Sequence, residues 1–210
     1  EILIGLVGSE MCIRDSSAGM HLDRMEIANA LSEVMGDKIE NIYYKSETTL
    51  PFKADLYPEN GFLKGGSTDN VAMEYGLKFH IDWLKGQKTG FFVDQRENRA
   101  LLERYANGRS VLNMFCYTGG FSVYGMRGNA ELVHSVDSSA KAIDLTNKNV
   151  ELNFPGDTRH AAFAEDAFKY LDRMGDQYDL IVLDPPAFAK HRDAPVSYTH
   201  LRAHETDQYL

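Results

Sequence analysis

The chain has 210 residues, of which 43% are hydrophobic and 25% are charged, and its formal net charge at pH 7 is −9. This length accommodates one domain and part of another. The excess of acidic residues argues against broad nonspecific binding of nucleic acids, but it allows a local basic face. Cys116 is the only cysteine between residues 17 and 195, so we expect no disulfide framework and predict a reducing, cytoplasmic environment. No apolar run reaches the length of a membrane-spanning segment.

The two ends of the chain are related to each other through their coding strands. Codons for VSYTHLRAHET (196–206) can be chosen so that their reverse complement, after one added base, encodes GLVGSEMCIRD (5–15). The nucleotide sequence obtained in this way also resembles a sequencing-library adapter. We therefore expect residues 1–16 and 196–210 to be non-native, adapter-derived segments and leave them out of the fold prediction. Because Cys12, His200 and His204 fall in these segments, we predict no metal site.

Residues 17–94 are predicted to form a small α+β domain. Apolar residues at helical spacing in 22–36 predict a helix that ends at Gly36. Strands are predicted at 39–47, 72–83 and 89–94, with a turn-rich segment at 50–66 and a hairpin connector at 84–88. This pattern by itself predicts no function for the domain.

From residue 95 onwards, helices and strands alternate. The predicted helices are 95–107, 119–128, 139–153 and 167–175, and the predicted strands are 110–115, 131–137, one within 159–166, and 178–184. This alternation predicts an α/β fold with a Rossmann-like parallel sheet and right-handed connections. Ligands of such sheets bind at the carboxyl ends of the strands, close to the point where the strand order reverses.

Glycines or acidic residues follow the predicted strands at this edge. The first strand leads into Thr118–Gly120, where glycine lets a ligand approach the backbone and a helix N-terminus offers amides. The second strand ends in Asp137, which can accept from both ribose hydroxyls of a nucleoside or can cap the next helix. The third unit ends in Asp166, which can accept from an adenine amino group that Phe168 covers, or can again be a helix cap.

The fourth strand runs into Asp184, Pro185 and Pro186, where the prolines fix the backbone outside a buried strand and the acid faces the crevice. The glycine turn and the three acids, in this order, predict a cofactor that contains a nucleoside. A dinucleotide dehydrogenase would carry G-x-G-x-x-G after the first strand, and a nucleoside triphosphatase would carry G-x-x-x-x-G-K-[ST]; the sequence has neither. S-adenosyl-L-methionine is therefore the cofactor that fits best.

Six segments carry a resemblance to a known family. They are VLNMFCYTGGFSVYG (111–125), SVDSSAKAI (135–143), AEDAF (164–168), IVLDPPAFAK (181–190), GFFVDQRENR (90–99) and NIYYKSETTLPFKADL (41–56). These segments resemble the RlmI-type class I S-adenosylmethionine-dependent rRNA methyltransferases, which make 5-methylcytosine in large-subunit rRNA. The resemblance covers residues 20–192. It implies that 17–94 is a middle domain on the RNA side and that 95–195 is part of the S-adenosylmethionine-binding methyltransferase domain, with rRNA as the partner.

The resemblance also implies roles for individual residues. Asp137 would bind the ribose with Ser138 beside it, and Asp166 and Ala167 would contact the adenine. Gln95 and Arg96 would lie near the methionine end of the cofactor or near the RNA. The rest of the implied cofactor loop is Asn113, Phe115, Tyr117, Thr118 and Gly119. The target base would contact Asp184, Pro185 and Pro186.

Two parts of the family pattern are not found in residues 17–195. The family begins with a PUA-type RNA-binding domain, and it continues past the fourth strand to a cysteine in an S-C-S-like motif. Methylation of cytosine at C5 needs a thiolate that adds to C6, after which C5 takes the methyl group and loses its proton. We expect this nucleophile beyond residue 195, and we expect that residues 17–195 alone do not methylate cytosine. Cys116, in the cofactor loop, is expected to be a buried structural thiol.

Two alternative functions remain open. Related enzymes with a D-P-P motif methylate guanine or other bases, and a downstream S-C-S motif would favour cytosine instead. A noncatalytic RNA-binding module could keep the same fold, and binding of S-adenosylmethionine would distinguish an enzyme from such a module. The sequence does not predict the oligomeric state.

Overall fold

The computed structural model describes residues 17–45, 56, 59–67, 71–82, 84–86, 90–175 and 177–185. The chain divides into two compact units, Glu1–Asn98 and Arg99–Leu210. Among the described residues, no helix has the length and apolar character needed to cross a membrane.

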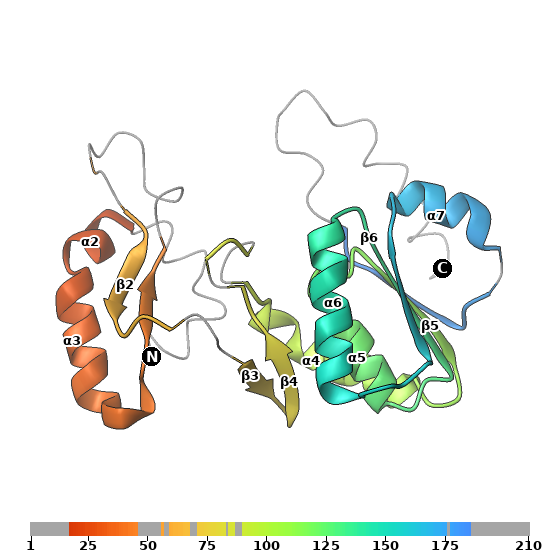
Figure 1. The fold of residues 1–210 in the computed structure, drawn as a ribbon, viewed down its shortest axis with the longest axis horizontal. Helices are drawn as coiled ribbons and strands as arrows, with labels where there is room; N and C mark the ends of the chain where they lie inside the picture. Colours follow the sequence, from red (N-terminus) through yellow and green to blue (C-terminus); the bar gives the residue numbers. More distant parts are fainter. Residues whose placement is uncertain are drawn as a thin grey trace, which may run out of the picture. The chain divides into compact units, whose positions relative to one another are not determined.

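The first unit contains a helical segment and two antiparallel strand pairs (Figure 1). Its elements are α2 (Ser17–Leu22), α3 (Arg24–Met35), the 3-10 helix η2 (Gly36–Lys38), β1 (Ile42–Tyr44), β2 (Gly61–Lys64), β3 (Val71–Glu74), β4 (Leu77–His80) and the 3-10 helix η4 (Val93–Gln95). Strand β1 pairs with β2, and β3 pairs with β4, so the four strands form two separate sheets.

The predicted helix at 22–36 is present as α3, but three other predictions for this unit were wrong. The predicted single strand 72–83 is a hairpin, because Tyr75 and Gly76 form a tight turn with φ angles of 47° and 83°. Positive φ at both central positions is the pattern of a type I′ hairpin turn, and tyrosine is not among the residues that usually indicate one.

The other two errors concern the segments on either side of this hairpin. The segment 50–66, which was predicted to be turn-rich, contains the strand β2. This strand begins at Gly61 and forms an antiparallel pair with β1. The described part of the predicted strand 89–94 forms no strand, and η4 begins at Val93 instead. At β2, pairing with a distant strand outweighs the turn preference of the residues. At η4, a local helical turn outweighs their strand preference.

The second unit is a four-stranded parallel sheet with helices on both faces (Figure 1). Its elements are α4 (Arg96–Tyr105, which spans the boundary between the units), β5 (Ser110–Met114), α5 (Gly120–Arg127), β6 (Leu132–Asp137), α6 (Ala140–Asn153), β7 (His160–Ala164), α7 (Ala167–Met174) and β8 (Leu180–Leu183). Each corresponds to an element predicted from the sequence, which confirms the α/β class and the parallel sheet.

The strand order is β7-β6-β5-β8, and each neighbouring pair is parallel. The chain moves in one direction from β5 to β7 and then returns to the other side of β5 as β8. Since connections between parallel strands are right-handed, this reversal places α5 and α6 on one face of the sheet and α7 on the other (Figure 1). The strand order therefore reverses at β5, and Thr118–Gly120, Asp137 and Asp166 follow or end the strands at that edge.

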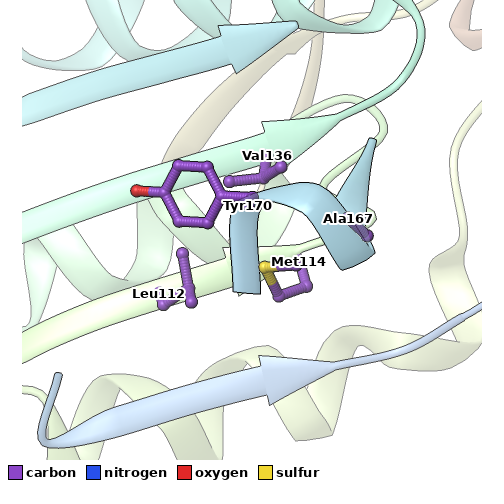
Figure 2. Packing of buried hydrophobic residues seen from close by; sticks show 5 residues of the cluster. All are labelled: Leu112, Met114, Val136, Ala167 and Tyr170. Atoms are coloured by element: carbon purple, nitrogen blue, oxygen red, sulfur yellow. The ribbon is translucent and has the colours of Figure 1, made fainter. Parts of the chain in front are cut away.

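Alternating side chains of β5 and β6 form the core beneath α7. Leu112, Met114 and Val136 lie in one buried cluster with Ala167 and Tyr170 of α7, as Figure 2 shows. Ala167 and Tyr170 are three positions apart and so lie on one side of the helix. This packing fixes the start of α7 over the carboxyl half of β5 and β6, where the predicted site lies.

Candidate functional site

The turn after β5 has an unusual backbone. Phe115 and Tyr117 have φ angles of 54° and 48°, and Gly119 has a φ of 74°. The main-chain N–H of Gly119 donates to the carbonyl of Cys116 over 2.8 Å. Non-glycine residues with positive φ cost free energy and persist where the surrounding structure holds them, and they concentrate at functional sites.

Helix α6 supplies the contacts that hold this turn. The Thr146 hydroxyl donates to the carbonyl of Tyr117 over 3.0 Å, and the Asn149 amide donates to the carbonyl of Thr118 over 2.8 Å. Both side chains are fully buried. The fit is close, because a Cβ atom on Gly119 would lie 2.6 Å from Cγ2 of Thr146. The sequence analysis missed Thr146 and Asn149; their only local signal is the three-residue spacing of two polar side chains on one helix.

Asp137 lies at the end of β6, against this turn. Its Oδ2 accepts from the main-chain N–H of Tyr117 over 3.0 Å, and its Oδ1 accepts from the main-chain N–H of Ser139 over 2.9 Å. Each carboxylate oxygen keeps a second lone pair, so the oriented group can still accept from two hydroxyls. The alternative role of Asp137 as a helix cap is wrong, because Ser139 caps α6 and accepts from the N–H of Ala142.

Asp166 follows β7 and is the N-cap of α7. Its Oδ1 accepts from the main-chain N–H of Phe168 over 3.1 Å and of Lys169 over 3.2 Å. Both bonds use one oxygen, so Oδ2 retains acceptor capacity. The N–H of Glu165 donates to the carbonyl of Asp137 over 3.0 Å, which joins the ends of β6 and β7. The predicted role of Asp166 as a helix cap is therefore confirmed, and the cap holds the Asp166 carboxylate at the same edge of the sheet as Asp137.

Two hydrophobic residues complete the region around Asp166. Phe168 is 45% exposed, although phenylalanine is a residue type that is often buried. Ala167 belongs to the core cluster under α7 (Figure 2). An exposed aromatic ring beside a carboxylate gives this edge a surface on which a planar ring can stack.

The fourth strand brings Asp184 to the same edge. Leu183 is the register partner of Met114, so Asp184 and Phe115 leave adjacent strands at the same level. Asp184 is exposed and Pro185 is half-buried. Pro186 lies outside the described residues.

Asn113 differs from its predicted place in the cofactor loop. It lies within β5 with its side chain buried, and its amide donates to the Ser122 hydroxyl over 2.8 Å. A chain of hydrogen bonds continues from Ser122 to Ser135 over 2.6 Å and from Ser135 to Nε2 of His160 over 2.8 Å. Asn113 thus supports the turn from within the sheet.

The last member of this chain of hydrogen bonds, His160, is uncharged at pH 7. Burial, with a smaller contribution from His134, lowers the pKa of His160 to about 4.

Gln95 and Arg96 lie in the first unit, at the junction of η4 and α4. The Gln95 side chain accepts from the amide of Asn98 over 2.8 Å. Arg96 lies over the ring of Tyr75, 5.4 Å from its centroid, and pairs with Glu97. Their proposed contacts with the cofactor or the RNA stay a prediction.

Cys116 is a buried thiol behind the turn. Its Sγ lies 3.6 Å from the Thr146 hydroxyl, and burial raises its pKa to about 12. The thiolate is the nucleophilic form of cysteine, so burial of Cys116 disfavours its reactive form at neutral pH. Among the described residues, no cluster of three histidine, cysteine or acidic side chains is arranged to hold a metal ion.

Comparison with known proteins identifies the family of the chain. Residues 60–199 match the family described as S-adenosylmethionine-dependent methyltransferase. The protein named "Ribosomal RNA large subunit methyltransferase I" from Aeromonas hydrophila is 38% identical over 213 residues, which cover 90% of this chain and 53% of that protein. The protein of the same name from Tolumonas auensis is 40% identical over 182 residues, covering 84% of this chain and 45% of that protein.

A solved structure shows the same similarity in three dimensions. A crystal structure described as a methyltransferase complexed with SAH superposes with a TM-score of 0.67 at 30% identity, covering 83% of this chain and 45% of that chain. The chain thus spans about half the length of the relatives it matches. The resemblance noted from the sequence motifs is confirmed, and the chain belongs to the family of S-adenosylmethionine-dependent methyltransferases.

Proposed function

We propose that this chain is the cofactor-binding part of an RNA methyltransferase that acts in the cytoplasm on large-subunit rRNA, with cytosine C5 as the target. The names of the relatives from Aeromonas hydrophila and Tolumonas auensis support the substrate class. The structural observation that carries the proposal is the Asp137 carboxylate, which two main-chain amides orient beside the strained turn after β5.

The residues present at this edge fit S-adenosylmethionine, which supplies an electrophilic methyl group when it is bound. Both oxygens of Asp137 can accept from the ribose hydroxyls through their remaining lone pairs. Oδ2 of Asp166 can accept from the adenine amino group, and the exposed Phe168 ring can cover the adenine. The absence of a side chain at Gly119 lets the turn pack against α6 while its backbone faces the ligand.

The acceptor side of the proposed site is Asp184 and Pro185, which leave β8 next to the turn. Asp184 can orient the base through an exocyclic amino group, which both cytosine and guanine possess. The described residues supply no thiolate, because burial keeps the Cys116 thiol protonated. The described part of the chain therefore binds the cofactor and orients the base, and we assign the nucleophile of cytosine methylation to another part of the protein.

Calorimetry with S-adenosylmethionine and S-adenosylhomocysteine tests the cofactor site directly. We expect saturable binding of both, with stoichiometry close to one, and a noncatalytic RNA-binding module would bind neither. In the organism that carries the gene, its deletion should remove one 5-methylcytosine from large-subunit rRNA in a mass-spectrometric map. Loss of a methylguanine instead would assign the chain to the other acceptor base.

A further inference from the structure

The first unit contains a cavity that the proposed cofactor site does not use. Its volume is about 390 Å³, and its walls include Arg24 and Met25 at the start of α3, Tyr44 at the end of β1, and Asn60 and Phe62 around the start of β2. Ligand sites in proteins have volumes of roughly 300–1,000 Å³. The cavity therefore has the size of a site for one small molecule such as a nucleoside.

An aromatic ring and a guanidinium group form one wall of the cavity. Cζ of Arg24 lies 5.7 Å from the centroid of the Tyr44 ring, and Nη1 of Arg24 donates to the main-chain carbonyl of His21 over 2.6 Å. The Tyr44 hydroxyl lies 2.5 Å from Nδ1 of His21, which fixes the orientation of the ring. Aromatic rings and arginine planes are the groups on which proteins stack the bases of single-stranded RNA.

The polar lining suits the edge of a base better than a phosphate group. Glu59 lines the cavity together with Arg24, so a bare anion would meet a carboxylate as well as a guanidinium. The Asn60 side chain has both a donor and an acceptor, and the Glu59 carboxylate is an acceptor for an amino group. A neutral ring with donors and acceptors on its edge matches this mixture.

We propose that this cavity binds one unpaired nucleotide of the RNA substrate, with its base stacked at the Arg24–Tyr44 wall. The inference rests on the proposed RNA methyltransferase function and adds an RNA contact in the first unit. It requires no contact between the two units, because all the residues involved belong to Glu1–Asn98.

Photochemical cross-linking of the full chain tests the location. The probe is a short single-stranded oligouridine that contains 5-iodouridine, which cross-links to nearby aromatic side chains. We expect mass spectrometry to find the cross-link on Tyr44 or Phe62. Cross-links confined to other peptides would overturn the proposal, and so would equally tight binding of a fully paired RNA duplex, whose bases cannot enter the cavity.

Substitutions test the chemistry of the wall. Arg24→Gln and Tyr44→Leu should each weaken binding of the oligouridine by roughly 5- to 100-fold, the range for loss of one stacked base. Lys38→Gln is the matched control, since it removes one positive charge just beyond the other end of α3, a helix that is roughly 16 Å long from Arg24 to Met35. Lys38→Gln should change the affinity by less than about twofold.

Two further variants separate stacking from charge and from folding. Arg24→Lys keeps the charge but loses the planar group, so it should weaken binding nearly as much as Arg24→Gln. Tyr44→Phe keeps the ring and should retain most of the affinity even though it loses the bond to His21. Full binding by Arg24→Lys, or equal losses in Arg24→Gln and Lys38→Gln, would show a nonspecific charge effect and would overturn the proposal.

Calorimetry with S-adenosylmethionine on the same preparation separates this inference from the proposed function. Cofactor binding without any cross-link at the cavity would refute the nucleotide site and leave the methyltransferase function intact. A cross-link at Tyr44 without cofactor binding would support the nucleotide site and refute the function.

Discussion

The main-chain N–H of Tyr117 donates to Oδ2 of Asp137 over 3.0 Å, and this bond joins the turn after β5 to the end of β6. The Tyr117 backbone has a φ of 48°, a conformation that tyrosine rarely adopts. The carboxylate therefore stabilises an unfavourable backbone conformation, and the turn in return orients the carboxylate.

Asp137→Asn should weaken binding of S-adenosylmethionine by roughly 10- to 100-fold, because one charged acceptor is replaced by an amide donor. Isothermal titration calorimetry measures this change. Asp144→Asn is the control, since Asp144 is an exposed carboxylate on α6 whose loss should leave the affinity unchanged. Equal affinities of Asp137→Asn and the unmodified chain would contradict the assigned ribose site.

Gly119→Ala should destabilise the fold by about 2–4 kcal/mol, because it combines a left-handed backbone with a close contact to Thr146. Gly156→Ala is the matched control: its φ of 71° is similar, but a Cβ atom there would meet nothing within 4 Å. The control should lose only about 1–2 kcal/mol. Urea denaturation measures both.

A second substitution tests the contact itself. Thr146→Ser removes Cγ2, the atom nearest to the added methyl group, and keeps the hydroxyl that donates to Tyr117. The Gly119→Ala/Thr146→Ser double variant should therefore be more stable than the sum of the two single changes predicts. Strict additivity would mean that the turn does not press against α6.

The Cys116 thiol should resist alkylation in the folded protein. Because burial raises its pKa to about 12 from the ordinary value of 9.0, the thiolate fraction stays small through pH 9. In a Cys12→Ser background, the rate of reaction with iodoacetamide should remain low up to pH 9 and rise strongly when denaturant unfolds the chain. Rapid labelling of the native protein at pH 8 would restore Cys116 as a candidate nucleophile.

The stability of the fold should fall as the pH is lowered from about 6.5 to about 4. Burial lowers the pKa of His160 to about 4 from the ordinary value of 6.5, so between these values the unfolded chain binds a proton that the folded chain does not. The loss from this residue should be up to about 3 kcal/mol. This loss of stability reaches its full size only near pH 4.

His160→Gln isolates this contribution, since the amide of glutamine can replace Nε2 in the bond to Ser135 but does not titrate. The pKa of His134 is also lowered by burial, so the variant should keep part of the pH dependence. Chemical denaturation at pH 7, 5.5 and 4.5 should show a smaller decline in the variant. Parallel declines would place the acid sensitivity elsewhere.

The parallel sheet could be predicted from the sequence because its signals are local. Apolar strands such as 110–114 and glycine stops such as Gly128 mark its elements within a few residues of their observed bounds. The first unit was predicted less well. The turn at Tyr75 and Gly76 lies inside an alternating pattern, and β2 pairs with β1, a strand about twenty residues earlier in the chain.

The same distinction applies to the candidate site. The acids at the strand ends could be predicted, because the carboxyl ends of parallel strands meet at one edge. The residues that support them could not. Thr146 and Asn149 act on a turn about thirty residues earlier, and Ser135 joins Asn113 to His160 through Ser122 on another element. Such contacts depend on the packed fold and leave no periodic signal in the chain.

The turn after β5 depends on partners that are synthesised later than the turn itself. Its bonds to Asp137, Thr146 and Asn149 span 20, 29 and 31 residues. A nascent chain that has emerged from the ribosome only as far as α5 therefore contains the turn sequence but none of these three partners. The proposed cofactor site would therefore become ordered during translation only after α6 has emerged and docked, and a ribosome paused before that point would present β5 without an ordered binding edge.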